Sequence, residues 1–192
     1  MKSSLRNMVA SLFGITFIAS AGVGLVYQVT KEPIAQAAEA ATREALTKVL
    51  PAFDQTTMES TTIDDLPVDV YTAKSSGGDV VGYAIKSMTK QGFAGVIEIM
   101  IGFTPEGEVV NVNVLSQSET PGLGTLMTED GNPLLLSIQG KRLSDVDLRV
   151  KKDGGDVDAL TAATISSRAY IDAVSRAFKA YKNETKGGGH NE

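Results

Sequence analysis

A stretch near the N-terminus, residues 7–30, contains no charged side chain and is mostly apolar. It lies between Arg6 and Lys31. As an α-helix this stretch would extend about 36 Å, which is enough to cross a hydrocarbon core of about 30 Å. The pattern therefore predicts a single transmembrane helix. Its largest apolar residues are Val9, Leu12, Phe13, Ile15, Phe17, Ile18, Val23, Leu25 and Val26.

The charges that flank this stretch predict its orientation. Lys2 and Arg6 precede the apolar run, so the positive-inside rule places the N-terminus in the cytoplasm and the rest of the chain across the membrane. A cleaved signal peptide is the alternative, but its apolar region would be only about 7–15 residues long. The small residues Ala35-Gln36-Ala37 also lie beyond Lys31, late for cleavage. We therefore expect a retained anchor.

The pattern after the anchor predicts a helical stalk and then a sheet. Ile34 to Leu50 is rich in Ala, Glu and Lys, so the helix should continue until Pro51 stops it. Gln55 to Leu66 is polar and rich in Thr, which indicates a loop or a weak strand. Two hairpins should follow, formed by Val68–Lys74 with Val80–Lys86 and by Val96–Phe103 with Glu108–Leu115.

The last third of the chain predicts further strands and helices. Leu134–Ile138 indicates a short helix, and Asp147–Val150 and Val157–Leu160 indicate strands. Together with the hairpins, these elements predict an α+β fold with an antiparallel sheet and flanking helices. A long amphipathic helix should close the chain, with one apolar and one charged side. The apolar positions are Ile165, Tyr170, Ile171, Val174, Ala177, Phe178 and Tyr181, and the charged ones are Arg168, Asp172, Arg176 and Lys179.

Thr164 lies at the predicted start of this last helix. A helix N-terminus has free N–H groups and the positive end of the helix dipole, which stabilise a phosphate, and Ser166 and Ser167 offer further donors. Ala162 and Ala163 leave room for a ligand. The alternative is that Thr164 only caps the helix, as a Thr before an apolar-periodic run often does.

Composition excludes several kinds of chemistry. The net charge is −5, and residues 1–31 contain three basic and no acidic residues, so the remainder has 15 basic against 23 acidic residues and a net charge of −8. Such an acidic domain has no electrostatic footprint for nucleic acid. The absence of Cys excludes disulfides, thiolate-bound iron–sulfur clusters and covalent c-type haem. The single His190 lies in a Gly-rich tail, where a ligand role is not expected.

The acidic segment Asp153–Asp158 has three carboxylates but lacks the acid spacing and the terminal Glu of a calcium loop. We interpret it as a solvated turn and expect no metal site.

Three motifs carry a resemblance to a known family. They are Asp158-Ala159-Leu160-Thr161-Ala162-Ala163-Thr164, the strand that starts at Gly92-Phe93-Ala94-Gly95, and the loop Glu119-Thr120-Pro121-Gly122-Leu123-Gly124. Together they resemble the FMN-binding domain family, in which the last Thr of the first motif is esterified by the phosphate of FMN. The resemblance covers roughly Val80 to Tyr181. One departure is Ala162, which stands where the family often has Gly.

This resemblance implies a covalent FMN at Thr164 and a set of flavin-binding residues around it. In that interpretation Thr120 and the loop amides bind the polar edge of the ring, Leu123 covers its face, and Glu119 sets the local charge. A plain Pro-Gly turn is the alternative for this loop. A flavin transferase that uses FAD and magnesium would install the cofactor, with Asp158, Leu160 and Thr161 as part of its recognition sequence. The implied cofactor-binding residues are Thr164, Asp158, Leu160, Thr161, Ala163, Glu119, Thr120, Gly122, Leu123 and Gly124.

Within the family, the chain resembles the G subunits of Rnf complexes, which are ion-translocating ferredoxin:NAD⁺ oxidoreductases. The C subunits of sodium-translocating NADH:quinone reductases share the C-terminal motif but have longer domains. The resemblance implies an electron relay in the bacterial inner membrane, beside other membrane subunits and lipid, without catalytic residues or independent turnover. The alternatives are such a C subunit of a sodium-translocating NADH:quinone reductase, and a non-redox anchored scaffold or binding domain outside the cytoplasm. We expect an anchor over 1–31, a stalk and connector over 32–66, the FMN-binding domain over 67–182 and a flexible tail over 183–192.

Overall fold

The computed structural model describes residues 4–187. The chain divides into two compact units, Met1–Thr42 and Arg43–Glu192. The predictions for Lys2 and His190 fall outside the described residues.

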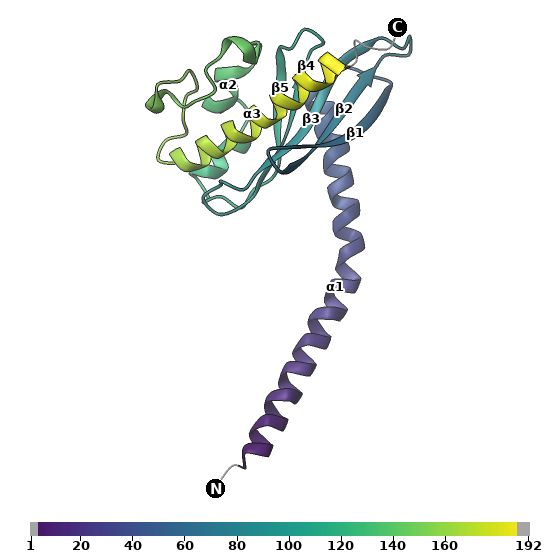
Figure 1. Cartoon of the computed structure of the whole chain (residues 1–192), viewed down its shortest axis with the longest axis vertical. Coiled ribbons are helices and arrows are strands. Elements are labelled where there is room, and N and C mark those ends of the chain that lie inside the picture. The colour runs from purple at the N-terminus through teal and green to yellow at the C-terminus, as the bar shows by residue number, and fades with distance from the viewer. Residues whose placement is uncertain (1–3, 188–192) are drawn as a thin grey trace. The chain divides into compact units, whose positions relative to one another are not determined.

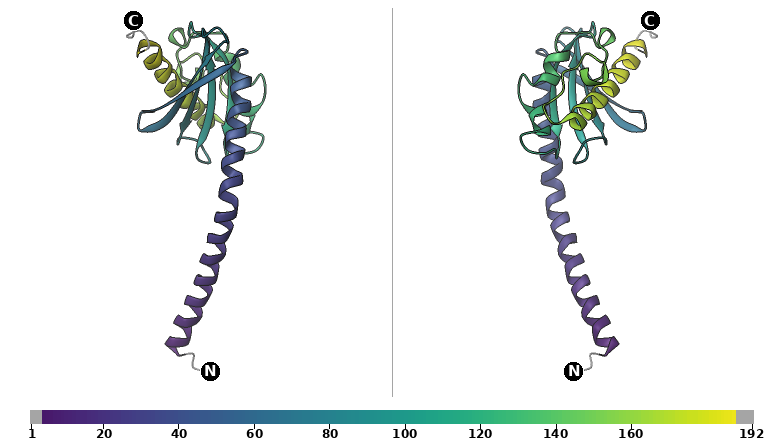
Figure 2. Two further views of the ribbon diagram at one scale, coloured as in Figure 1. Left: turned by 90° about the vertical axis from the view of Figure 1, so that its right-hand side faces the viewer. Right: turned by 90° about the vertical axis from the view of Figure 1, so that its left-hand side faces the viewer.

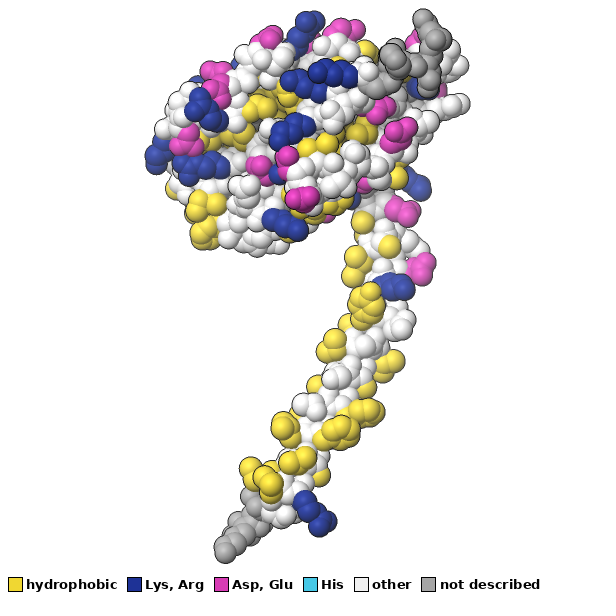
Figure 3. Space-filling view, in the orientation of Figure 1, with side chains coloured by type: hydrophobic (Ala, Val, Ile, Leu, Met, Phe, Trp, Pro, Cys, Tyr) yellow, Lys and Arg dark blue, Asp and Glu magenta, His cyan; other side chains and the backbone are white. Residues whose placement is uncertain are grey.

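The first element, α1 (Leu5–Val49), confirms the predicted long helix (Figure 1). It continues through Pro33 and ends two residues before Pro51, because a proline disfavours helical geometry in the residue before it. Apolar side chains cover its N-terminal part (Figure 3), and large ones such as Leu12, Phe13 and Ile18 are exposed. By length and composition α1 can cross a membrane, and it is the one described helix that can do so.

The second unit is built on a five-stranded antiparallel sheet in the order β1-β2-β3-β4-β5, so each strand pairs with its sequence neighbours. The predicted hairpins are confirmed, with slightly shifted ends. The strands are β1 (Gln55–Ile63), β2 (Leu66–Lys74), β3 (Val80–Thr89), β4 (Ile97–Phe103) and β5 (Val109–Ser116).

Helices cover both faces of this sheet (Figure 2). One face packs against α3 (Thr164–Gly187), and the other packs against the C-terminal end of α1. The strands alternate accordingly, since Ile99 and Ile101 join the α3 side of the core while Met100 joins the α1 side. Both sets of side chains are fully buried. The sheet is therefore the middle layer of the second unit.

The α1 side of the core begins before the expected domain boundary at residue 67. Ala45, Leu46, Val49 and Leu50 are buried against the sheet. Gln55–Ile63 forms a regular strand where the sequence indicated a loop or a weak strand. This strand lies at the sheet edge and its side chains are almost all exposed, so backbone pairing with β2 forms it without a hydrophobic pattern.

The segment between the sheet and α3 is mostly irregular. The predicted short helix is confirmed as α2 (Pro133–Ile138), which Asn132 caps by accepting a hydrogen bond from the N–H of Leu135. The strands predicted at Asp147–Val150 and Val157–Leu160 are wrong. Only a single bridge joins Val150 to Val157, and a 3-10 turn (Lys151–Asp153) separates them. Their apolar side chains are buried, but the intervening chain satisfies its backbone through turns.

Helix α3 confirms the predicted amphipathic helix but corrects two of its positions. Ile165 was assigned to the buried side and is 49% exposed. Arg176 was assigned to the charged side and is only 4% exposed. Its guanidinium donates to the carbonyl of Met88 at 2.6 Å and to Asp172 Oδ2 at 3.0 Å, which compensates its burial. The helix also runs through residues 183–187, which the sequence assigned to a flexible tail.

Candidate functional site

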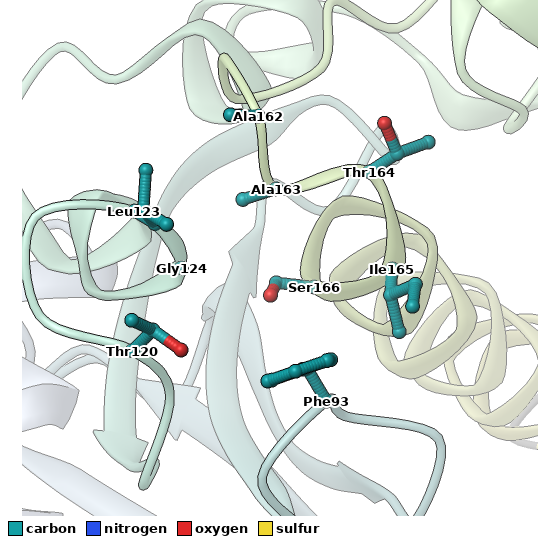
Figure 4. A pocket seen from close by; sticks show the side chains of 9 residues that line it. All are labelled: Phe93, Thr120, Leu123, Gly124, Ala162, Ala163, Thr164, Ile165 and Ser166. Carbon is teal, nitrogen blue, oxygen red and sulfur yellow. The ribbon is translucent and has the colours of Figure 1, made fainter.

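A cavity of about 290 Å³ opens at the N-terminal end of α3 (Figure 4). Three segments that are distant in sequence form its walls: the turn between β3 and β4, the loop after β5, and the residues around the start of α3. All lie in the second unit. The lining residues are Phe93, Thr120, Leu123, Gly124, Ala162, Ala163, Thr164, Ile165 and Ser166.

The walls of the cavity are largely apolar. Phe93 is 66% exposed, Ile165 is 49% exposed and Leu123 is 38% exposed. Figure 4 shows that the three residues come from different segments and surround the same space. Exposed apolar side chains that converge on one cavity are typical of a ligand-binding site. The cavity therefore offers apolar walls to a bound ligand.

Thr164 is the first residue of α3 and lies at the rim of this cavity. The carbonyl of Ala163 accepts the first helical hydrogen bond, from the N–H of Ser167 at 3.0 Å, so Ala163 holds the N-cap position. Among the hydrogen bonds of the described residues, none uses the Thr164 hydroxyl. The first-turn N–H groups of Thr164, Ile165 and Ser166 also lack protein acceptors within residues 4–187.

The turn that leads into α3 contains a strained residue. Ala162 has a φ of 58°, in the left-handed region that favours glycine. This conformation directs the chain from Thr161 into the helix. Ser167 supports the same turn, because its Oγ accepts from the N–H of Leu160 and donates to the carbonyl of Ala163, both at 2.9 Å. Ser167, and not Thr164, makes the local side-chain hydrogen bonds at this helix end.

The loop 119–124 forms the opposite wall. The carbonyl of Thr120 accepts from the N–H of Leu123 at 3.2 Å, and Gly122 has a φ of 72°, so the loop turns tightly. The hydroxyl of Thr125 accepts from the N–H of Gly122 at 2.9 Å. The exposed Thr120 hydroxyl points into the space between Leu123 and Phe93 (Figure 4). The loop therefore offers one apolar and one polar side chain to a ligand.

Glu119 lies behind the cavity wall and is 4% exposed. Its Oε1 accepts from the N–H of Ala94 at 3.0 Å, and its Oε2 accepts from the hydroxyl of Ser166. The backbone N–H of Glu119 donates to Oε1 of Gln117 at 2.6 Å. Glu119 itself does not line the cavity, but its carboxylate contacts residues of the other two wall segments.

The structure brings together only part of the set expected from the sequence. Thr164, Ala163, Thr120, Leu123 and Gly124 line the cavity. Asp158, Leu160 and Thr161 do not line it. The same is true of Gly122, which lies in the loop but faces solvent.

Asp158, Leu160 and Thr161, all in the first motif, differ in their exposure to solvent. Asp158 is exposed and pairs with Lys151, with 2.8 Å between Oδ2 and Nζ. Thr161 is exposed, whereas Leu160 is 3% exposed and belongs to the core. A partner that recognises the folded motif can therefore reach the side chains of Asp158 and Thr161 but not that of Leu160.

Phe93 and Ile165 line the cavity although the sequence indicated no site role for them. Both were identified only as members of a motif or an apolar helix face. The available signal for Phe93 was a large aromatic residue between Gly92 and Gly95, a context with no regular burial pattern. No local signal separated Ile165 from the buried positions of α3.

The carboxylates of the acidic segment have separate protein partners. Asp153 accepts two hydrogen bonds from Arg168, at 2.7 and 2.8 Å, and this guanidinium lowers the pKa of the Asp153 carboxyl below its ordinary value. Asp156 Oδ2 accepts from the N–H of Asp147 at 2.7 Å. Within residues 4–187 no group of three or more His, Cys, Asp or Glu is arranged to hold a metal ion.

Comparison with known proteins relates this arrangement to a family. The FMN-binding domain matches residues 92–179, a range that contains every residue lining the cavity. The G subunit of the ion-translocating oxidoreductase complex of Shewanella amazonensis is 36% identical over 188 residues, which cover 91% of this chain and 86% of that protein. The corresponding protein of Pseudomonas aeruginosa is 31% identical, with 94% and 89% covered.

Among solved structures, Shewanella oneidensis NqrC matches with a TM-score of 0.47 and 20% identity, over 67% of this chain and 69% of that one. The matches to the two G subunits cover 91% and 94% of this chain. The chain belongs to the family of G subunits of ion-translocating oxidoreductase complexes and contains its FMN-binding domain.

Proposed function

We propose that this chain is the electron-relay subunit of an Rnf-type complex and that it carries FMN through a phosphoester to Thr164. The coarser part of this proposal, a role in electron transport with an FMN-binding domain, follows from the family. The observation that carries the finer part is the placement of Thr164. Its unpartnered hydroxyl lies at the rim of an apolar cavity and at the start of a long helix, within the described part of the chain.

The residues at this site fit FMN. Free N–H groups in the first turn of α3 and the positive end of its dipole favour the phosphate beside Thr164. Phe93, Leu123 and Ile165 provide apolar surface for the ring system. The Thr120 hydroxyl supplies a hydrogen-bonding group for a polar edge. These features of the chain support one ligand that is phosphorylated at one end and aromatic at the other.

FMN, when bound, supplies the reversible uptake and release of electrons. The protein contributes attachment, orientation and partial exclusion of water. Thr164 would hold the phosphate end, and the apolar walls would hold the ring while leaving one side open to a redox partner. We propose no independent turnover, because the described lining of the cavity contains no Asp, Glu, His, Lys or Arg side chain that could act as a general acid or base.

The anchor suits a relay inside a membrane complex. Helix α1 can cross a membrane, and we propose that the N-terminus faces the cytoplasm, because Arg6 precedes the apolar part and residues 1–31 contain no acid. The domain then lies on the non-cytoplasmic side of a bacterial inner membrane. Covalent attachment would prevent loss of FMN there, and the anchor would keep it beside the partner subunits.

We further propose that a flavin transferase attaches the FMN after recognising the exposed part of the first motif. Asp158 and Thr161 are accessible in the folded domain, whereas Leu160 is buried. Asp158→Ala should therefore slow flavin attachment more than it affects folding. Equal attachment rates for this variant and the wild type would exclude a role for Asp158 in recognition.

The proposed function is tested by expressing the full chain with and without a flavin transferase and recording ultraviolet-excited fluorescence on a denaturing gel. Thr164→Val removes the hydroxyl while keeping the side-chain shape, and Thr164→Ser keeps a hydroxyl. We expect a fluorescent band for the wild type with the transferase and a dark band for Thr164→Val. A dark wild-type band despite an active transferase would instead indicate a scaffold or a noncovalent binder.

A further inference from the structure

The three walls of the cavity meet at one buried carboxylate. Glu119 belongs to the loop 119–124, Ala94 belongs to the turn that carries Phe93, and Ser166 belongs to the first turn of α3. Both oxygens of Glu119 are used, one by the N–H of Ala94 and the other by the hydroxyl of Ser166. A single side chain thus joins three segments that are far apart in the sequence.

The packing around this carboxylate leaves no room for a side chain at two neighbouring glycines. A Cβ added to Gly92 would lie 2.8 Å from Oε1 of Glu119 and 2.2 Å from the carbonyl oxygen of Gly95. A Cβ added to Gly124 would lie 2.7 Å from both Cβ of Glu119 and Oγ of Ser166. The glycines therefore allow the three segments to close on Glu119. These contacts explain why glycine stands at both positions.

We infer that Glu119 is a positioning residue that holds the cavity walls in place and so fixes the orientation of the flavin ring. This inference rests on the proposed covalent FMN at Thr164. The phosphoester alone tethers only one end of the cofactor, so the ring is immobilised by Phe93, Leu123 and Ile165. Without the carboxylate, each wall segment loses the hydrogen bond that sets its distance from the others.

Ser166 extends this arrangement to the cavity itself. It is 3% exposed, it lines the cavity, and its hydroxyl donates to Glu119. Removal of this hydroxyl leaves Glu119 Oε2 buried without that donor, which is unfavourable. The pair should therefore act as a unit, and changes at either residue should have similar and non-additive effects on the ring.

The experiment uses the full chain in detergent, flavinylated by the transferase, and measures the fluorescence anisotropy and the visible circular dichroism of the attached flavin. We expect Glu119→Ala to retain a covalent flavin but to lose anisotropy and the circular dichroism band. Glu119→Gln should recover most of both signals, because its amide can still accept from Ala94 and contact Ser166. Ser166→Ala should resemble Glu119→Ala.

The control is Glu59→Ala, which replaces an exposed glutamate on the edge strand β1 that pairs with β2 and does not line the cavity. It should leave both signals unchanged. If Glu119→Ala does not fold, as judged by far-ultraviolet circular dichroism, Ser166→Ala and Glu119→Gln decide the matter. Wild-type anisotropy in Ser166→Ala and in any folded Glu119→Ala would overturn the inference. A wild-type chain without covalent flavin would instead contradict the proposed function.

Discussion

At the scale of single residues, the start of α3 combines a strained backbone with N–H groups that are available to a ligand. Ala162 adopts a left-handed backbone conformation, and the next helix turn leaves N–H groups without protein acceptors in the described part of the chain. A non-glycine residue in this conformation costs about 1–2 kcal/mol. The strain gives a physical reason why glycine would be favoured at this position, since glycine adopts the same backbone without that cost.

We predict that Ala162→Gly stabilises the domain by up to about 1 kcal/mol, because relief of strain exceeds the added entropy of the unfolded chain. Chemical denaturation of the apo protein would measure this change. The matched control is Ala163→Gly, where the N-cap residue has no positive φ and the same substitution should not stabilise. Destabilisation by Ala162→Gly would contradict the strain argument.

The ion pair near the start of α3 gives a prediction about pH. Arg168 lowers the pKa of Asp153 in the folded state, so the pair contributes stability above the unfolded pKa near 3.8, and this contribution disappears as the pH falls through the lower folded value. We expect Arg168→Ala to return the Asp153 pKa toward its ordinary value, as NMR titration would detect. Because the pair is exposed, stability at neutral pH should change little.

At the scale of elements, the sheet depends on one close approach between α1 and β4. A Cβ added to Gly102 would lie 1.8 Å from the carbonyl oxygen of Val49, so no side chain fits between the helix end and the strand. We predict that Gly102→Ala destabilises the domain by about 3 kcal/mol, at the upper end of overpacking effects. Thermal unfolding would measure the loss.

A matched substitution is available at Gly77, where an added Cβ would have its nearest neighbour at 3.5 Å and the backbone has no positive φ. Gly77→Ala should change stability by less than about 0.5 kcal/mol. Similar melting temperatures for Gly102→Ala and Gly77→Ala would contradict the packing of α1 against β4.

Sequence patterns predict most of these elements but not all of them. The anchor helix, both hairpins, α2 and α3 follow from apolar spacing and from Pro and Gly positions. Strand β1 does not, because it is a polar edge strand formed by backbone pairing with β2. The strands expected around Val150 and Val157 do not form, for the opposite reason. Here the apolar pattern is present, but irregular chain buries the two valines without a strand.

The site was only partly predictable for a similar reason. Motifs identified Thr164 and the loop 119–124, because each lies within one continuous stretch of sequence. The cavity also needs Phe93, Ile165 and the contact between Glu119 and Ser166, and these depend on how distant segments meet. The burial of Arg176 was equally hidden, because its partner is a backbone carbonyl on β3.

At the scale of the whole molecule, the second unit includes the last turns of α1. Ala45, Leu46, Val49 and Leu50 bury one face of the sheet, opposite α3. The second unit therefore begins at Arg43, and only the last turns of α1 belong to it.

We predict that a chain starting at Arg43 is soluble, cooperative in unfolding and competent for flavin attachment. A chain starting at Asp54 should aggregate or melt at a clearly lower temperature, because Ala73, Ala84 and Met100 lose their cover. Size-exclusion chromatography and thermal unfolding would compare the two. Equal stability of both chains would show that the end of α1 is dispensable.

The central claim is covalent attachment of FMN to Thr164. The most direct measurement is mass spectrometry of the tryptic peptide 153–168 from chain produced with the transferase, with fragmentation to locate the modification. We predict a mass increase equal to FMN minus water on Thr164 and none in Thr164→Val. An unmodified peptide, or a modification located on Thr161, Ser166 or Ser167, would contradict the claim.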